Sequence, residues 1–186
     1  MSSPHKEIHF EFDIVQYLTS NGWLEGDLSK YDRELALYPE DVVGWIKDTQ
    51  PKAWEKLKAT HNGANEKTLL GRLAKVLDIE GSLFVLRQGF KDIGSGKIDM
   101  CQFRPAQEIN PETMAKYQHV RCRVVRQVRY SVSNENSIDL VFFINGVPVA
   151  TAELKTDFTQ SVDDAKNQYR FDRNPRDLKW TPNLRH

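Results

Sequence analysis

Cysteine is almost absent from this chain, which has only Cys101 and Cys122 among its 186 residues. Two thiols cannot make the disulfide framework of a small secreted protein, so a reducing compartment is predicted. The N-terminal residues lack the apolar stretch of a signal peptide, and no apolar run approaches the ~20 residues that span a bilayer. We therefore expect a cytoplasmic protein of bacterial type that makes no contact with a membrane.

An excess of charge is missing as well, because 26 Lys and Arg residues balance 26 Asp and Glu residues. Any binding of nucleic acid must therefore come from a local patch. The histidines and cysteines show no metal-ligand spacing, and no Ser or Cys nucleophile arrangement is present. The segment Gly94–Ile98 resembles a phosphate loop superficially, but Lys91 stands where a glycine is required and Ile98 where Ser or Thr is required. We expect no ATP-driven motor within this chain.

Apolar periodicity divides the chain into a helical first part and a second part rich in strands. Helical spacing predicts helices over residues 8–21, on either side of Pro51 and over residues 69–77. The segment Ser82–Gln88 predicts a strand, and alternation from Val120 predicts another. Together with a β-hairpin and a helix nearer the C-terminus, this order indicates an α/β core preceded by helices.

The strand that begins at Val120 carries the densest basic group of the chain: Arg121, Arg123, Arg126 and Arg129. Alternation places Val124, Val128 and Tyr130 on one face and most of the arginines on the other, with Arg126 breaking the apolar row. Two interpretations stay open. The arginines contact DNA phosphates without reading sequence, or they form an ordinary solvated strand face.

The most informative feature is a pair of apolar runs, residues 138–144 and 147–155, joined by Asn145-Gly146. An Asn-Gly pair between runs of β-branched and aromatic residues is a strong hairpin signal. Asp139 opens the first strand, while Glu153 and Lys155 close the second, two residues apart on one face. Charged side chains are seldom buried unless they are paired or bind metal.

Two carboxylates and an ammonium group at one sheet edge suit a Mg²⁺-dependent phosphodiesterase. Mg²⁺ prefers oxygen ligands and keeps several waters, so Asp139, Glu153 and the carbonyl of Leu154 would suffice as protein ligands. Lys155 would orient the attacking water or stabilise developing charge. The alternative is an exposed charged pair at a strand end.

The register of the hairpin decides between these alternatives. A plain two-residue turn places Asp139 opposite Ala152, and Asp139 and Glu153 then point to opposite faces. A bulge or an odd loop places Asp139 opposite Glu153 and unites them. The predicted site requires the second register.

Six segments, taken together and in order, carry a family resemblance: Phe10–Ile14, Asn21–Trp23, Arg126–Tyr130, Ile138–Pro148, Glu153–Lys155 and Asn167–Arg173. They resemble the PD-(D/E)xK nuclease superfamily, and within it the N-terminal nuclease domain of the type I restriction enzyme R subunit. The resemblance covers most of the chain. It implies a restriction-endonuclease-like core, with a central mixed sheet flanked by helices and extra N-terminal helices.

By this resemblance Asp139, Glu153 and Lys155 are the catalytic trio, and Asp139 and Glu153 are the metal ligands. Gln168 matches the Gln of the family's Gln-x-x-x-Tyr motif, on a helix beside the active site. Asp172 stands at the Tyr position of that motif, and Tyr169 is the adjacent aromatic residue.

Other residues are candidates for supporting roles. Glu11 is the candidate for the helix-borne Glu that many superfamily members place near the metal, and the alternative is an exposed Glu11 on the first helix. The candidates for DNA contact are basic residues at helical spacing around Gln168: Lys166, Arg170 and Arg173.

The resemblance also implies a larger assembly. Residues 1–186 would form a single nuclease domain, with a helical part over about 1–80 and a catalytic core over about 82–178. This domain would be the N-terminal fragment of a protein whose ATP-dependent translocase lies outside it, so that ATP serves only the motor. Duplex DNA and the methyltransferase and specificity subunits of a restriction-modification complex would be the partners, and Mg²⁺ the cofactor.

Two rival functions stay open. The same fold serves as a docking module for DNA or a methyltransferase partner, without turnover. Alternatively, the chain is a stand-alone or structure-specific nuclease of the same superfamily. The first predicts no metal at Asp139 and Glu153, and the second predicts that the isolated chain cuts DNA.

Overall fold

The computed structural model describes residues 3–60, 65–130 and 136–154. In these ranges the helices are α1 (Ser3–Ser20), η1 (Leu28–Lys30, a 3-10 helix), α2 (Pro39–Thr49), α3 (Pro51–Thr60), α4 (Asn65–Glu80), α5 (Ser82–Gln88) and α6 (Pro111–Gln118). The strands are β1 (Leu24–Glu25), β2 (Phe90–Asp92), β3 (Gly96–Ile98), β4 (Cys122–Arg129), β5 (Ser137–Ile144) and β6 (Val147–Ala152). None of the described helices combines the length and apolarity needed to cross a membrane.

A four-stranded mixed sheet in the order β1-β4-β5-β6 forms the centre of the molecule. β1 runs parallel to β4, whereas β4, β5 and β6 pair antiparallel. The predicted α/β class is therefore confirmed for the described part of the chain. β2 and β3 form a separate hairpin, and Gly94 and Ser95 lie in its turn. No helix follows this turn directly, so it is not a phosphate loop.

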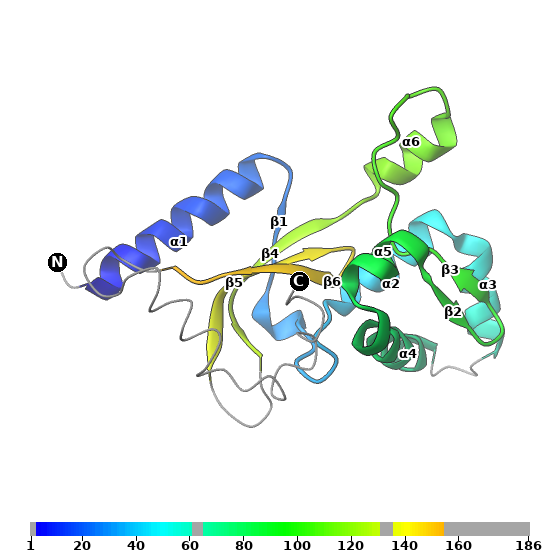
Figure 1. The fold of residues 1–186 in the computed structure, drawn as a ribbon, viewed down its shortest axis with the longest axis horizontal. Helices are drawn as coiled ribbons and strands as arrows, with labels where there is room; N and C mark the ends of the chain where they lie inside the picture. The colour runs from blue at the N-terminus through cyan, green and yellow to red at the C-terminus, as the bar shows by residue number, and fades with distance from the viewer. Residues whose placement is uncertain (1–2, 61–64, 131–135, 155–186) are drawn as a thin grey trace.

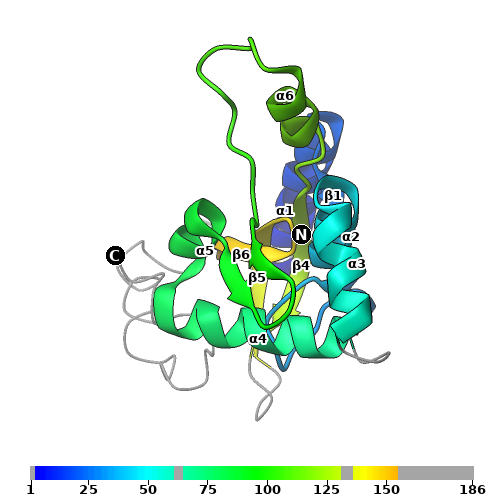
Figure 2. The ribbon, with the colours of Figure 1, turned by 90° about the vertical axis from the view of Figure 1, so that its right-hand side faces the viewer.

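Different segments cover the two faces and one end of the sheet (Figure 1). α1 lies across one face, where Val15 packs with Val124 and Leu140. On the opposite face Tyr38, which precedes α2, packs against Phe143 of β5. The helices α2 to α5 and the β2–β3 hairpin gather at the end where β6 begins and form the largest core cluster (Figure 2).

Local sequence signals explain where several helices begin. Pro39 and Pro51 are the first residues of α2 and α3, positions at which a missing N–H costs little. α6 was not predicted, yet it begins at Pro111 after Asn110, whose side chain accepts hydrogen bonds from two N–H groups of the first turn. The Asn110-Pro111 pair is the signal in the sequence from which the start of this helix could have been predicted. α6 has no buried residue and projects from the body of the molecule (Figures 1 and 2).

Residues Ser82–Gln88 form the helix α5, so the predicted strand is wrong. Val85 and Leu86 are buried, whereas their neighbours Leu83 and Phe84 are exposed, which is the pattern of one helical face. A short apolar run does not by itself distinguish a strand from a buried helix. A glycine with positive φ lies at each end and limits the helix to two turns.

β4 does not keep the predicted alternation of its side chains. Val124 packs beside α1, while Val125 and Val128 both pack in the cluster on the other face. Between the two, Gln127 has a φ of 51°. This left-handed conformation costs a non-glycine residue about 1–2 kcal/mol and changes the phase of the strand. The prediction that Val124 and Val128 share a face is therefore wrong.

Candidate functional site

A β-bulge in the β5–β6 hairpin sets the geometry of the predicted site. Next to the turn, Phe143 pairs with Pro148, but Phe142 pairs with Ala150, so that Val149 is an extra residue. The bulge follows directly after Pro148, and proline within a sheet is confined largely to edges and bulges. Pro148 is thus a sequence signal for the bulge.

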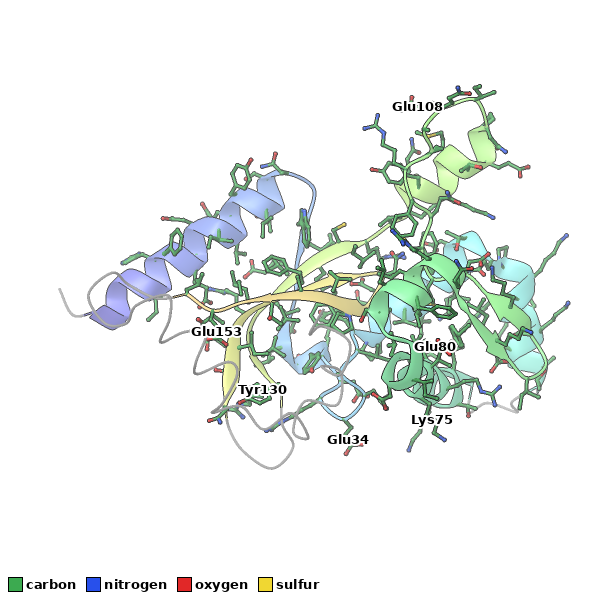
Figure 3. All side chains as sticks on the ribbon, viewed as in Figure 1. Glu34, Lys75, Glu80, Glu108, Tyr130 and Glu153 are labelled. Atoms are coloured by element: carbon green, nitrogen blue, oxygen red, sulfur yellow. The ribbon has the colours of Figure 1, made fainter. Side chains whose placement is uncertain are left out.

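Beyond the bulge the strands have the register that the predicted site requires. Leu140 pairs with Ala152, and the same register extended by one residue sets Asp139 opposite Glu153. Glu153 lies half-buried at the end of the sheet that α1 crosses (Figure 3). In this register the two carboxylates would come from facing positions, Asp139 on β5 and Glu153 directly after β6.

Hydrogen bonds to both neighbouring strands fix the carboxylate of Asp139. One oxygen, Oδ2, accepts a hydrogen bond of 2.7 Å from the backbone N–H of Leu154, just after β6. The other, Oδ1, accepts a hydrogen bond of 3.3 Å from Nε2 of Gln127 on β4. A carboxylate offers about four lone-pair sites, so two such bonds orient Asp139 and leave it able to bind a cation.

Helix α1 brings Glu11 to the same place. Glu11 is only 7% exposed, so its alternative placement on an exposed helix face is wrong. One oxygen, Oε2, accepts a hydrogen bond of 2.9 Å from Nε2 of Gln127, and Oε1 lies 3.8 Å from Nε of Arg126. Burial of this carboxylate is offset by an amide donor and a nearby guanidinium group.

The sequence did not identify Gln127 as a site residue. The structure places its amide between Glu11 and Asp139, and its Oε1 accepts a hydrogen bond of 3.0 Å from Ser137. The signals in the sequence are the irregularity of the apolar row at Arg126 and the place of Gln127 within the resemblance segment Arg126–Tyr130. Nothing in the strand pattern predicts that Gln127 takes a left-handed conformation.

The arginines of the basic group act mainly within the fold. Arg123 is buried and pairs with Asp41 at 2.6 Å, and Arg121 pairs with a carboxylate of α2 at 2.7 Å. Arg126 lies 3.1 Å from a carboxylate of Glu25 on β1. Arg123 is therefore not part of a solvated strand face, whereas Arg126, with its side chain 41% exposed, lies at the surface.

A cavity of about 290 Å³ lies elsewhere, between α2, α5 and the segment that leads from β3 to α6. Its lining includes Cys101 but no predicted site residue. Burial raises the pKa of Cys101 to about 11, whereas nucleophilic cysteines have a lowered pKa. The cavity is therefore not the predicted phosphodiesterase site.

Several predicted site residues lie outside the described residues: Lys155, Lys166, Gln168, Tyr169, Arg170 and Arg173. Within the described ranges, no group of three or more His, Cys, Asp or Glu side chains is close enough to hold a metal ion. The described geometry therefore joins Glu11 and Asp139 through the amide group of Gln127, and Glu153 follows directly after the strand that pairs with β5.

Comparison with known proteins identifies the family. The model of the family described as "Type I restriction enzyme R protein N terminus" matches residues 11–185, which is nearly the whole chain. The chain matches no curated protein and no solved structure. A match of this extent, on a chain that has the hairpin and the α/β sheet described above, shows that this protein belongs to the family of type I restriction enzyme R protein N-terminal regions.

Proposed function

We propose that this chain is the metal-dependent endonuclease domain of a type I restriction enzyme and hydrolyses phosphodiester bonds of duplex DNA. The observation that supports this most directly is the bulge, beyond which Leu140 pairs with Ala152, the register in which Asp139 would face Glu153. Pro148 gives the bulge a local cause, because proline has no N–H for the ladder. The bulge also shifts the register of β6 by one residue, toward the pairing in which the two carboxylates would act together.

The donor atoms at this site suit Mg²⁺. Asp139, Glu153 and the carbonyl of Leu154 offer hard oxygen ligands, and Mg²⁺ needs few of them because it retains waters. When bound there, Mg²⁺ would lower the pKa of a coordinated water and stabilise charge on the phosphate. The Leu154 N–H holds the Asp139 carboxylate in one orientation, which reduces the cost of ordering it for a ligand.

The chain's other residues would handle substrate and water. Lys155 would orient the attacking water or stabilise the developing charge. Gln168 and Tyr169 would lie beside the site, and Glu11 would add a third acidic group. The DNA backbone would be held by cations around Gln168: Lys166, Arg170 and Arg173.

The wider assembly follows from the family. An R protein acts in a restriction-modification complex, so cleavage here would follow ATP-driven translocation by motor domains outside this chain. Sequence recognition and methylation would belong to the specificity and methyltransferase subunits. These partners explain how a domain with zero net charge reaches DNA without a strong field of its own.

The test is cleavage by the assembled enzyme together with Mn²⁺ titration of this chain. We expect Asp139→Ala, Glu153→Ala and Lys155→Ala each to lower cleavage by roughly 10²–10³-fold or more. Asp139→Ala also abolishes Mn²⁺ binding. Asp13→Ala is the matched control, because Asp13 is an exposed acidic residue of α1. Undiminished cleavage by Asp139→Ala would reject the nuclease and favour a docking module.

A further inference from the structure

Gln127 occupies an unusual position in the sheet. The β4–β5 register pairs Arg126 with Leu140 and Val128 with Ile138, so Gln127 faces Asp139 between them. Its left-handed backbone, with φ 51°, interrupts an antiparallel ladder that is otherwise in constant register. Strained backbone of this kind in the middle of a strand is most often kept where it aims a side chain.

The contacts of the Gln127 side chain fix the orientation of its amide. Nε2 donates to Glu11 at 2.9 Å and to Asp139 at 3.3 Å, while Oε1 accepts from the hydroxyl of Ser137 at 3.0 Å. The amino group has two hydrogens and no acceptor capacity, which matches two carboxylates. One side chain thus joins α1, β4 and β5.

No other described contact links the two carboxylates. Arg126 lies 3.8 Å from Glu11 and 3.1 Å from Glu25, so its described ion pairs are with carboxylates of α1 and β1. Asp139 is otherwise held by the Leu154 N–H. Packing of α1 brings Glu11 near the sheet, and among the described contacts the amide of Gln127 is the one that donates to both carboxylates.

We propose that Gln127 is a positioning residue of the metal site, which holds Glu11 and Asp139 beside one another for a divalent cation. This inference rests on the proposed function and adds to it that Glu11, and with it α1, belongs to the site. Gln127 acts through the two carboxylates and touches neither substrate nor the reacting phosphate. The amino group of Gln127 is a neutral donor that lies between the two carboxylates. By donating to both, it would hold them in place for the cation.

The first test measures Mn²⁺ binding to the full chain by calorimetry for Gln127→Gly. Glycine accepts the left-handed backbone without strain, so the free energy of unfolding is expected to be preserved while the amide is lost. We expect the affinity for Mn²⁺ to fall by about 10–100-fold, the usual effect of removing a group that orients a ligand. Gln88→Ala, an exposed glutamine of α5, is the matched control and should bind as the wild type does.

The second test uses Gln127→Glu, which keeps the length of the side chain and replaces the donor by an oxygen. Three carboxylates then lie close together, and among the described residues Arg126 is the cation beside Glu11, at 3.8 Å. Like charges favour protonation, so protons compete with Mn²⁺ as the pH falls. We expect the affinity of this variant to fall more steeply than that of the wild type between pH 7 and pH 5, an effect that a purely structural role would not produce.

The outcomes separate the two proposals. Wild-type affinity in Gln127→Gly, or a wild-type pH profile in Gln127→Glu, overturns the positioning role while Asp139→Ala still abolishes binding. Equal Mn²⁺ binding by the wild type and Asp139→Ala overturns the proposed function itself. If Gln127→Gly fails to fold, the pH profile of Gln127→Glu decides.

Discussion

Asp41 is a buried acidic residue that joins α2 to the sheet. It is 1% exposed, and its two oxygens accept hydrogen bonds of 2.6 Å and 2.8 Å from Arg123 of β4. Arg123 also donates to the carbonyl of Glu25 and lies over the ring of Tyr38. Burial by itself would lower the pKa of Arg123, but the Asp41 carboxylate more than offsets this and raises that pKa.

Asp41→Ala is therefore expected to lower the free energy of unfolding by about 3–5 kcal/mol, since it leaves a buried guanidinium group without its partner. Urea unfolding followed by circular dichroism measures the free energy of unfolding of the variant and of the wild type. Glu55→Ala is the control, because Glu55 pairs with Lys58 at the surface and exposed pairs contribute less than about 1 kcal/mol. Similar losses in the two variants would contradict a structural role for Asp41.

At the scale of elements, the β5–β6 hairpin is the unit on which the candidate site depends. Asn145 and Gly146 both have positive φ, 49° and 80°, as a tight turn between twisted strands requires. Asn145 is fully buried, and its side chain accepts a hydrogen bond from the Arg121 N–H and donates one to the Met100 carbonyl. The turn is therefore anchored to its surroundings, and the register beyond it is well defined.

Inserting an alanine between Ala152 and Glu153 tests that register. The insertion moves Glu153 one position beyond Asp139 and turns its side chain to the other face. We expect Mn²⁺ affinity to fall to the level of Asp139→Ala, while circular dichroism shows an unchanged fold. An alanine inserted between Ala106 and Gln107, in the exposed segment before α6, is the control. Retained affinity in the first insertion would argue against a paired site.

At the scale of the whole molecule, the candidate site and the largest core lie at different places. The largest cluster joins α2 to α5 with the start of β6, whereas the cluster under α1 has three buried members among the described residues: Val15, Val124 and Leu140. Among the described residues, the smaller of these two clusters therefore adjoins Glu11 and Asp139. A ligand that joins α1 to the sheet should stabilise this part of the fold most.

A divalent cation is accordingly expected to stabilise the folded chain. At a free Mn²⁺ concentration of 100 times Kd, linkage predicts a gain of about 2.7 kcal/mol, which chelation with EDTA removes. Hydrogen exchange should slow in α1 and β4 to β6 more than in α2 to α5. An equal gain in Asp139→Ala would show that the cation acts elsewhere.

Some features of the fold could be predicted from short-range patterns, and others could not. The helices around Pro51 and the Asn145-Gly146 hairpin depend on residues next to each other in the chain, and the prediction is confirmed for both. The Ser82–Gln88 segment was predicted wrongly because a run of seven residues fits either a strand or a helix. In the structure two adjacent residues, Val85 and Leu86, are buried between exposed pairs, which is the period of a helix and not of a strand. Packing against the rest of the chain decides which of the two forms.

The candidate site likewise has features that the sequence predicts and features that only packing decides. The sequence by itself determined that Asp139 and Glu153 would flank one hairpin, because spacing along two strands and an Asn-Gly turn act locally. Only the tertiary structure decided that Gln127 would reach Glu11 across 116 residues and that Arg123 would pair with Asp41 across 82. Such contacts depend on how helices and strands pack after they form, and periodicity does not record which distant residues will meet.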